Sequence, residues 1–465
     1  MITTLLCVTG IVLANVLMYW RTIKYRYVSD DIISAYRTPE KNPFWHYFWV
    51  LEGKLKSVSF KKMSEGTNHI LSTLPRVDHI INIVLHVLTC VGIYLGFGAN
   101  PMSLAAALLF SFCPMNNQGV VWISARSYTL AALAMVWCLA LPTWIGGIPL
   151  LIATYTNAGF LMPLVLVGST HWPLLVLLPL LWWFWLPNFR KNVVDKINME
   201  VHVNDKVIHP KKLILGFKTF GFYLFRGIIP MPATFYHHEL ESLAGSGIKR
   251  AYSYCPLFWT GVLGFLAMLV YVCLTPWSLV SLGLLWFCLG VAPFCNLYRM
   301  QQELADRYVY VANVGLMVAM AALLIHWPIL LGLWIGAFAA TTWQFIPAYQ
   351  DDFWLVEQSR MNDRRSWFAW HIAAMKRFEV GSHQEAVMFW TIARQLSPKE
   401  FKILYNLASA TAIVGNYCTE PQRTKMIQEA FQWLKVAGEN IPPGQETFAT
   451  NMIEDFKKGK IAILT

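Results

Sequence analysis

Long uncharged blocks of apolar residues dominate the first three quarters of this chain. The first block, Ile2–Trp20, has no charged residue, and further apolar blocks lie at His79–Phe97, Ser103–Met115, Ala131–Leu186, Leu257–Ala292 and Val309–Phe345. A bilayer core about 30 Å thick needs roughly 20 residues of helix, and a backbone inside lipid has to satisfy its own hydrogen bonds. The pattern predicts an all-α, polytopic membrane protein with about 11 transmembrane helices.

Composition supports this interpretation over a large soluble core. The chain is 56% hydrophobic and 14% charged, with a mean hydropathy of +0.44, which is far from a typical soluble domain. Its nine cysteines have no metal-binding spacing and form no disulfide framework.

The net charge of +11 is concentrated in three regions. These are residues 21–78, residues 187–256 and everything after Tyr349, and they alternate with short uncharged turns such as Gly98–Pro101. With an odd number of spans, all three regions lie on one side of the membrane, together with a shorter loop at 293–306. The positive-inside rule would place that side in the cytoplasm, but long segments follow this rule poorly. Charge alone therefore leaves the orientation open.

A second domain is predicted to begin at residue 349, after a membrane domain of residues 1–348. From Tyr349 onwards the sequence is that of a soluble helical segment, and small and aromatic residues recur at tetratricopeptide-like positions. These residues are Trp370, Gly381, Ala386, Trp390, Ala393 and Pro398, then Leu404, Leu407, Ala408 and Gly415, then Ala430, Leu434, Ala437 and Pro442. Small residues let paired helices approach closely, and the prolines end helices. We expect a short repeat domain, residues 349–465, with Glu446–Lys460 as a capping helix; an unrelated bundle of helical hairpins is the alternative.

Two adjacent carboxylates, Asp30 and Asp31, follow the first apolar block. Neighbouring carboxylates repel each other, and one with a raised pKa suits a general base that accepts a proton from a hydroxyl. The alternative is a solvated loop.

Three arginines, Arg76, Arg126 and Arg307, lie near predicted span ends. Arginine is a natural ligand of phosphate, so these side chains are candidates for holding a lipid phosphate. Each of them can instead simply extend to the headgroup region.

Histidines give weaker signals. His79 and His86 lie on one helical face, two turns apart, as expected for polar packing residues. The run His237, His238 and Glu239 is only superficially like a metal site, because adjacent histidines point apart on a helix. We predict no metal there.

Four sequence elements occur together in one order. The first is the acidic segment YVSDDIISAY, and the second is PRVDHIINIVLHVLTCVGIYL, in which a basic residue precedes H-x-x-N-x-x-x-H. The third is LLFSFCPMNNQGVVWISARSYTLAAL, which contains a proline turn and the motif W-I-S-x-R-S. The fourth is APFCNLYRMQQELADRYVYVANVGL, which contains P-x-x-N-L, an acidic–Arg pair and Y-x-Y. Together with the C-terminal repeats, they resemble the transmembrane and tetratricopeptide-repeat O-mannosyltransferases, within the GT-C class of integral-membrane glycosyltransferases. The resemblance covers nearly the whole chain.

The resemblance implies a GT-C fold whose polar loops and C-terminal domain lie on the luminal or periplasmic face, in the endoplasmic reticulum or the bacterial inner membrane. It implies a polyprenyl-phosphate sugar donor as co-substrate, with no metal, cofactor or nucleic-acid partner. By matching positions, Asp30 or Asp31 is the catalytic base. The donor phosphate is assigned to Arg126, Arg307 and Arg76, and the remaining site-lining residues are His79, Asn82, His86, Asp306 and Tyr308.

The chain departs from the family pattern in two places. Asp306 stands where the family often has Glu, and Thr156-Asn157 stands where it often has Lys-Glu before Gly159. The expected function is an inverting, hexosyl-type transfer to an acceptor hydroxyl, on a protein positioned by the repeats. The alternatives are a scaffold that has lost the chemistry, which Thr156-Asn157 favours, and a transporter of lipid-linked sugars.

Overall fold

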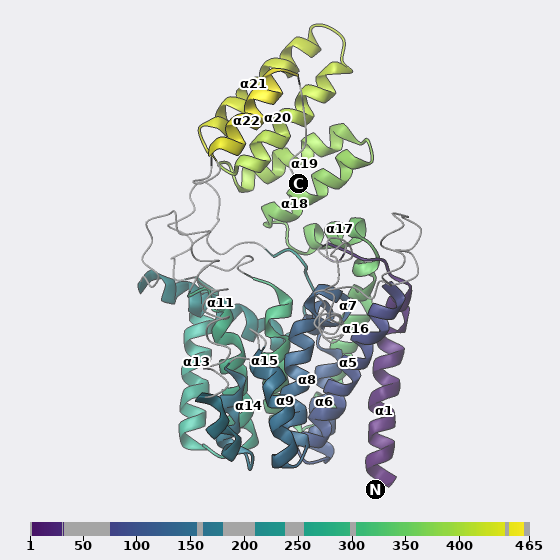
Figure 1. The fold of residues 1–465 in the computed structure, drawn as a ribbon, viewed down its shortest axis with the longest axis vertical. Helices are drawn as coiled ribbons and strands as arrows, with labels where there is room; N and C mark the ends of the chain where they lie inside the picture. The colour runs from purple at the N-terminus through teal and green to yellow at the C-terminus, as the bar shows by residue number, and fades with distance from the viewer. Residues whose placement is uncertain are drawn as a thin grey trace, which may run out of the picture.

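The structure is a computed structural model that describes residues 2–29, 31, 75–155, 161–179, 210–237, 255–297, 304–441 and 446–459. Within these ranges all regular structure is helical. A helical body extends from α1 to η9, and helices α17 to α22 lie at one end of it (Figure 1).

The helical body begins with α1 (Ile2–Tyr19), which η1 (Trp20–Lys24) continues. Its other elements are α5 (Pro75–Gly96), α6 (Pro101–Phe112), η3 (Pro114–Asn116), α7 (Asn117–Val121), η4 (Ile123–Ala125), α8 (Arg126–Ala140), α9 (Thr143–Tyr155), η5 (Met162–Gly168), η6 (Trp172–Leu177), α11 (Pro210–Ile228), α13 (Pro256–Leu274), α14 (Leu279–Val291), η7 (Ala292–Phe294), η8 (Asp306–Val309), α15 (Tyr310–Leu324), α16 (Pro328–Phe345) and η9 (Ile346–Gln350).

Several of these helices are compatible with a multi-pass membrane protein. In the described part of the chain, six are long and apolar enough to cross a bilayer: Ile2–Lys24, Pro75–Gly96, Ile123–Ala140, Pro256–Leu274, Asp306–Leu324 and Pro328–Gln350. A seventh arises if α6 and the bent segment Pro114–Val121 form one span, and Thr143–Ala153 and Leu279–Phe294 are shorter apolar helices. The predicted number of about 11 is therefore not confirmed. Part of the block Ala131–Leu186 forms the short helices η5 and η6 instead of a long span.

Two of the predicted polar loops include helical residues. Residues 21–24 continue the first helix as η1, and α5 begins at Pro75, so the predicted loop 21–78 is shorter at both ends. The predicted loop 187–256 contains the helix α11, which is not among the candidate spans. Lys218 and Arg226 interrupt its apolar sequence, yet both are buried against the rest of the body.

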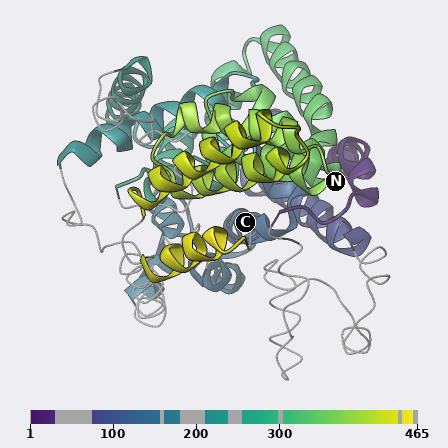
Figure 2. The same cartoon turned by 90° about the horizontal axis from the view of Figure 1, so that it is seen from above.

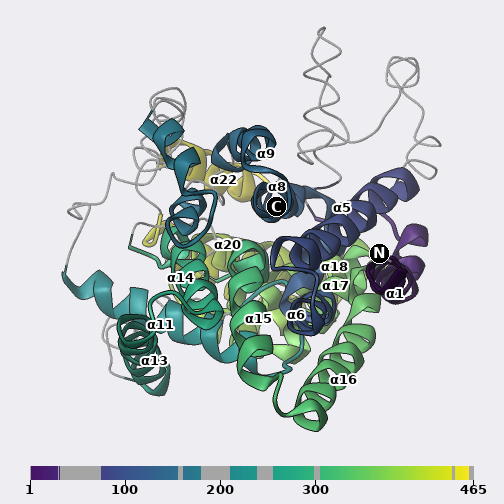
Figure 3. The same ribbon diagram turned by 90° about the horizontal axis from the view of Figure 1, so that it is seen from below.

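Helix α15 is the centre of the body. It packs against α14, α6 and α8 near the middle of the body (Figure 3). Every residue from Tyr310 to Ala321 is buried. Glycines let the neighbouring backbones approach: a Cβ at Gly315 would lie 2.3 Å from the Gly283 carbonyl oxygen, and one at Gly261 would lie 1.9 Å from the Phe217 carbonyl oxygen. Such small-residue contacts are typical of helix packing in membranes.

The C-terminal region consists of helices packed in pairs (Figure 2). They are α17 (Asp352–Asn362), α18 (Trp367–Glu379) with α19 (His383–Leu396), α20 (Phe401–Asn416) with α21 (Gln422–Gly438), and α22 (Glu446–Lys457). The predicted repeat positions Ala386, Trp390 and Ala393 are fully buried. The tetratricopeptide assignment itself stays a prediction, and Pro442 lies outside the described residues.

One hydrophobic core passes from the body into the C-terminal region without a break. It includes Tyr349, Leu355 of α17 and Trp370 of α18, and it reaches Leu407 of α20. The other face of α20 shares a second cluster with α21 and α22, around Tyr405 and Leu434. The composition of the chain changes at residue 349, the predicted domain boundary, but the buried hydrophobic core continues across it.

Candidate functional site

A break in the helix after α6 builds the irregular segment on which the site is assembled. Pro114 lacks a backbone N–H and cannot continue the helix, and the two halves, Pro101–Phe112 and Pro114–Val121, meet at 57°. The chain then forms η4 before Arg126 begins α8. This segment lies at the end of the body that carries the C-terminal helices, because α7 contacts η9 (Figure 1).

The Asp31 carboxylate is bound to this segment. One oxygen accepts hydrogen bonds from the Ser124 backbone N–H at 2.8 Å and from its hydroxyl at 2.6 Å, and the other accepts from the Ile123 N–H at 3.3 Å. Asp31 is fully buried. The segment that follows η1 is thereby fixed to η4, which directly precedes α8. Asp30 lies outside the described residues.

Arg126 forms a buried ion pair with Asp78 of α5. The guanidinium lies 3.1 Å from the Asp78 carboxylate and also donates to the Asp78 carbonyl oxygen and to the Asn82 side chain. Neither charged side chain has exposed surface. The Tyr27 hydroxyl donates to the same carboxylate at 2.8 Å, and burial together with Asp78 raises the pKa of Tyr27, so this hydroxyl stays protonated. Asp31 lies near enough to interact electrostatically with Arg126.

Helix α5 presents its predicted site residues at two depths. Near its beginning, His79 is buried with the Tyr25 ring edge-on at 6.4 Å, and Asn82 donates to the Val120 carbonyl oxygen at 2.9 Å. His86 lies two turns, about 10 Å, further along the helix, where its Nδ1 is 2.6 Å from the Tyr310 hydroxyl. His79 and Asn82 belong with Arg126, whereas His86 is part of the packing around α15.

Asp306 anchors a second buried cluster. Its carboxylate accepts from the Arg226 guanidinium at 3.3 Å, from the Thr234 N–H at 3.2 Å and from His237 Nε2 at 2.8 Å. Burial lowers the pKa of His237 despite the nearby carboxylate, so its imidazole is neutral and donates. This cluster fixes the loop after α11 to η8.

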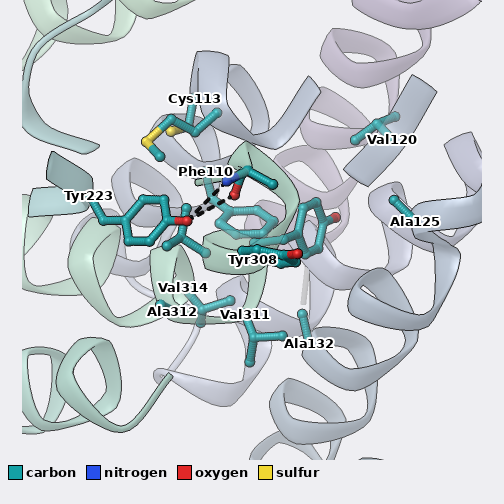
Figure 4. Packing of buried hydrophobic residues seen from close by; sticks show 14 of the residues in the cluster. Phe110, Cys113, Val120, Ala125, Ala132, Tyr223, Tyr308, Val311, Ala312 and Val314 are labelled. Carbon is teal, nitrogen blue, oxygen red and sulfur yellow. Dashed lines mark hydrogen bonds between the residues drawn. The ribbon is translucent and has the colours of Figure 1, made fainter. Parts of the chain in front are cut away.

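Arg307 and Tyr308 lie between the two clusters. The Arg307 N–H donates to the Gln118 side chain at 2.8 Å, and its guanidinium lies 4.8 Å from the centre of the Trp122 ring. Tyr308 stacks on Phe294 with ring centres 4.8 Å apart. Figure 4 shows Tyr308 among the buried side chains, together with the hydrogen bonds of Tyr223 that hold the backbone of Ala305. Arg307 and Asp31 thus flank the same short stretch, Trp122–Ser124.

The structure brings together half of the ten predicted site residues. Asp31, His79, Asn82 and Arg126 share one cluster, and Arg307 lies across Trp122 from it. Arg76 is in the first turn of α5, where it is exposed.

Of the histidine run that was predicted to bind no metal, the structure describes His237. His237 and Arg226 both contact the Asp306 carboxylate. His238 and Glu239 lie outside the described residues. Among the residues that the structure describes, no group of three or more His, Cys, Asp or Glu side chains has the arrangement of a metal site.

The sequence did not reveal the partners that neutralise these charges. Asp78, Tyr27, Ser124 and Arg226 were not predicted as site residues, although Arg226 interrupts an apolar stretch. A charged residue inside a span usually has a buried partner, and that rule was the available signal.

The geometry contains side chains with the functions that a transfer reaction needs: a carboxylate, a guanidinium and hydrogen-bond donors, held by rigid elements beside the C-terminal helices. No protein-family model, no curated protein and no solved structure matches this chain.

Proposed function

We propose that the chain is an integral-membrane glycosyltransferase that moves a sugar from a polyprenyl-phosphate donor to an acceptor hydroxyl on a protein. One observation carries the proposal. Charged residues from four separate segments gather at the end of the apolar body that bears the C-terminal helices: Asp31 after α1, Asp78 in α5, Arg126 at the start of α8, and Arg307 in η8. Ionisable residues inside membrane helices are rare and commonly functional.

The proposed reaction is a single inverting displacement. The acceptor oxygen forms a bond to the anomeric carbon of the sugar as the bond from that carbon to the lipid phosphate oxygen breaks. The acceptor proton passes to Asp31 or Asp30, and the electron pair of the broken bond stays on the phosphate. A cation beside the leaving oxygen stabilises the charge that develops there.

The contacts and exposure of each arginine indicate whether it could bind the donor phosphate or only position other residues. Arg126 has no exposed surface and already contacts Asp78 and Asn82, so we assign it to positioning the Asp31-binding segment. Arg307, which is 7% exposed, and the exposed Arg76 remain the candidates for phosphate contact. The C-terminal helices would hold the acceptor near the site, which is a proximity effect.

Substitution of the carboxylates tests the proposal. Full-length Asp30→Asn and Asp31→Asn variants, with Asp455→Asn in α22 as the matched control, are assayed for transfer from a panel of polyprenyl-phosphate sugars to a serine/threonine peptide. Loss of a general base lowers turnover by roughly 10²–10⁴-fold, while donor binding stays nearly unchanged. Arg307→Ala is expected to weaken donor binding as well. Full turnover in both Asn variants would remove the mechanism.

A catalytically inactive scaffold is the second candidate. The observation in its favour is that Asp31, Asp78, Arg126 and Asp306 are all fully buried and all engaged by protein partners. Under this alternative no donor is turned over by the unmodified chain, and Asp31→Asn lowers thermal stability without any other phenotype.

A further inference from the structure

A hollow of about 580 Å³ lies where the first and last candidate spans end. It adjoins the cluster of Asp31 and Arg126, because its lining residue Tyr25 also contacts His79. Its volume is in the range of small-molecule sites, roughly 300–1,000 Å³. It is formed by η1 and the residues after it, facing η9, and the Arg26 N–H donates to the Gln350 carbonyl oxygen at 3.2 Å to join the two walls. Its lining residues are Arg21, Lys24, Tyr25, Arg26, Pro347, Gln350 and Asp351.

The lining of this hollow is strongly basic. Arg21, Lys24 and Arg26 face a single carboxylate, Asp351, and that carboxylate already caps α17 by accepting from the Trp354 N–H at 2.9 Å. Within the described part of the chain, no ion pair joins these three cations to a carboxylate. Several unneutralised cations around one hollow attract an anion.

Hydrogen-bond donors are available in the same place. The Arg21 guanidinium lies 3.4 Å from the centre of the Trp343 ring, and this stacking uses its face and leaves the N–H groups at its edge free to donate. Burial raises the pKa of Tyr25 to about 12, so its hydroxyl is also a donor at neutral pH.

The hollow lies at the level expected for lipid headgroups. Trp20 and Trp343, beside it, are 48% and 43% exposed, and tryptophan is enriched where the hydrocarbon core meets water. Both flanking helices present apolar side chains outwards, such as Leu13 and Leu17 of α1 and Leu333 of α16, as a lipid-facing surface does. The hollow is therefore placed where a lipid headgroup can reach it.

We propose that this hollow is a binding site for the headgroup of an anionic phospholipid, with Arg21 and Arg26 contacting the phosphate oxygens and Lys24 adding a third charge. The site is separate from Arg307 and Arg76, and it does not depend on the proposed glycosyl transfer. A lipid bound here contacts both the end of α1 and η9, and so joins the first span to the start of the C-terminal region.

The test measures lipid retention by the full-length chain in detergent, using native mass spectrometry. The probes are dioctanoyl phosphatidylglycerol, dioctanoyl phosphatidylcholine and inorganic phosphate, each titrated separately. The variant is Arg21→Gln/Lys24→Gln/Arg26→Gln. The matched control is Lys399→Gln/Arg423→Gln/Lys425→Gln, which removes the same number of charges from exposed positions of the C-terminal region.

The unmodified chain and the control are expected to bind phosphatidylglycerol at least tenfold more tightly than phosphatidylcholine. Each basic residue near a membrane surface contributes about fivefold in affinity for anionic lipid, so the triple variant should lose roughly 100-fold. Lys24→Gln alone, at an exposed side chain that leaves the fold intact, should lose about fivefold.

Three outcomes would overturn the proposal. If the Lys24→Gln chain and the triple variant both bind phosphatidylglycerol like the control, the hollow is not the site. Equal affinity for both lipids would mean that the cations only extend to the headgroup region without selecting a charge. Binding of inorganic phosphate as tight as that of phosphatidylglycerol would identify a free-phosphate site instead of a lipid site.

Discussion

The ion pair between Asp78 and Arg126 gives a quantitative test of why these charges lie inside the helical body. Both side chains lack exposed surface, and the guanidinium is 3.1 Å from the carboxylate. Removing one partner of such a pair leaves an uncompensated buried charge, which costs about 3–5 kcal/mol. Asp78→Asn keeps an acceptor oxygen for the guanidinium, so we expect destabilisation near the lower limit, ~3 kcal/mol. Arg126→Gln leaves the carboxylate with the Tyr27 hydroxyl and should have a similar effect.

The double variant shows whether the loss of stability comes from an unpaired charge or from a change in side-chain shape. Asp78→Asn/Arg126→Gln removes both charges and keeps polar side chains of similar size, so its stability should lie within ~1 kcal/mol of the unmodified chain. The two single effects are then strongly non-additive, as expected for residues in direct contact.

Thermal unfolding in lipid nanodiscs measures these differences. With an unfolding entropy of about 2.1 cal/mol/K per residue, a change of 1 kcal/mol shifts Tm by roughly 1 °C for a chain of 465 residues. Each single variant should therefore unfold about 3 °C lower and the double variant within about 1 °C. Glu454→Gln is the control, because its partner Lys458 is 3.9 Å away on an exposed face and such pairs contribute little. Single variants that unfold with the unmodified chain, or a double variant lowered by the sum of the two, would refute the argument.

Three further predictions concern other parts of the fold. Burial lowers the pKa of His371 to about 3, whereas the same side chain in the unfolded protein titrates near 6.5. The stabilising contribution of His371 is therefore full above about pH 6.5 and is lost as the pH falls towards 3. His371→Gln should flatten the dependence of Tm on pH over this range. Gly261→Leu should separate α13 from Gly221 of α11, since even a Cβ at residue 261 would lie 1.9 Å from a backbone oxygen. We expect a lower Tm, or loss of folded protein on size-exclusion chromatography. Cysteines introduced at Ser382 and at His326 of a cysteine-free chain should label with a membrane-impermeant maleimide from opposite sides, because the two residues lie beyond opposite ends of α16.

Each of these predictions has a contradicting result. An unchanged pH profile in His371→Gln would mean that the histidine does not stay neutral in the folded chain. A Gly261→Leu chain as stable as the original would mean that α11 and α13 do not pack closely. Labelling of both cysteines from one side would contradict the arrangement of α16.

Long, uncharged helices could be predicted from the sequence because hydropathy over 20 residues leaves few alternatives. The central helix α15 and the terminal helices α1 and α16 all fall within predicted apolar blocks. The number of spans could not be predicted in the same way, since hydropathy does not register chain breaks. Pro163 and Pro173 begin short 3₁₀ segments in a stretch that is apolar throughout.

For each contact in the candidate site, the sequence allowed one of the two residues to be predicted but not its partner. Asp31 and Arg126 stand out in the sequence, but Asp78, which neutralises Arg126, is 48 positions away from it. Whether a buried arginine holds a substrate or a neighbouring helix depends on that tertiary partner. The four segments that meet near Trp122 are joined by backbone N–H groups and carbonyl oxygens as much as by side chains, and no residue pattern identifies such contacts.

The continuous core between the body and the C-terminal helices has a consequence for biosynthesis and for protein production. Leu355 and Trp370 belong to the same buried cluster as the apolar body, so α17 and α18 complete their packing only when the preceding helices of the body are already in place. A water-soluble fragment that starts at Tyr349 would expose this surface and aggregate. Helices α21 and α22 pack against the face of α20 around Tyr405 as a separate cluster, but Ile403 and Leu407 on α20 belong to the large core, so a fragment that starts at α20 would also expose apolar surface.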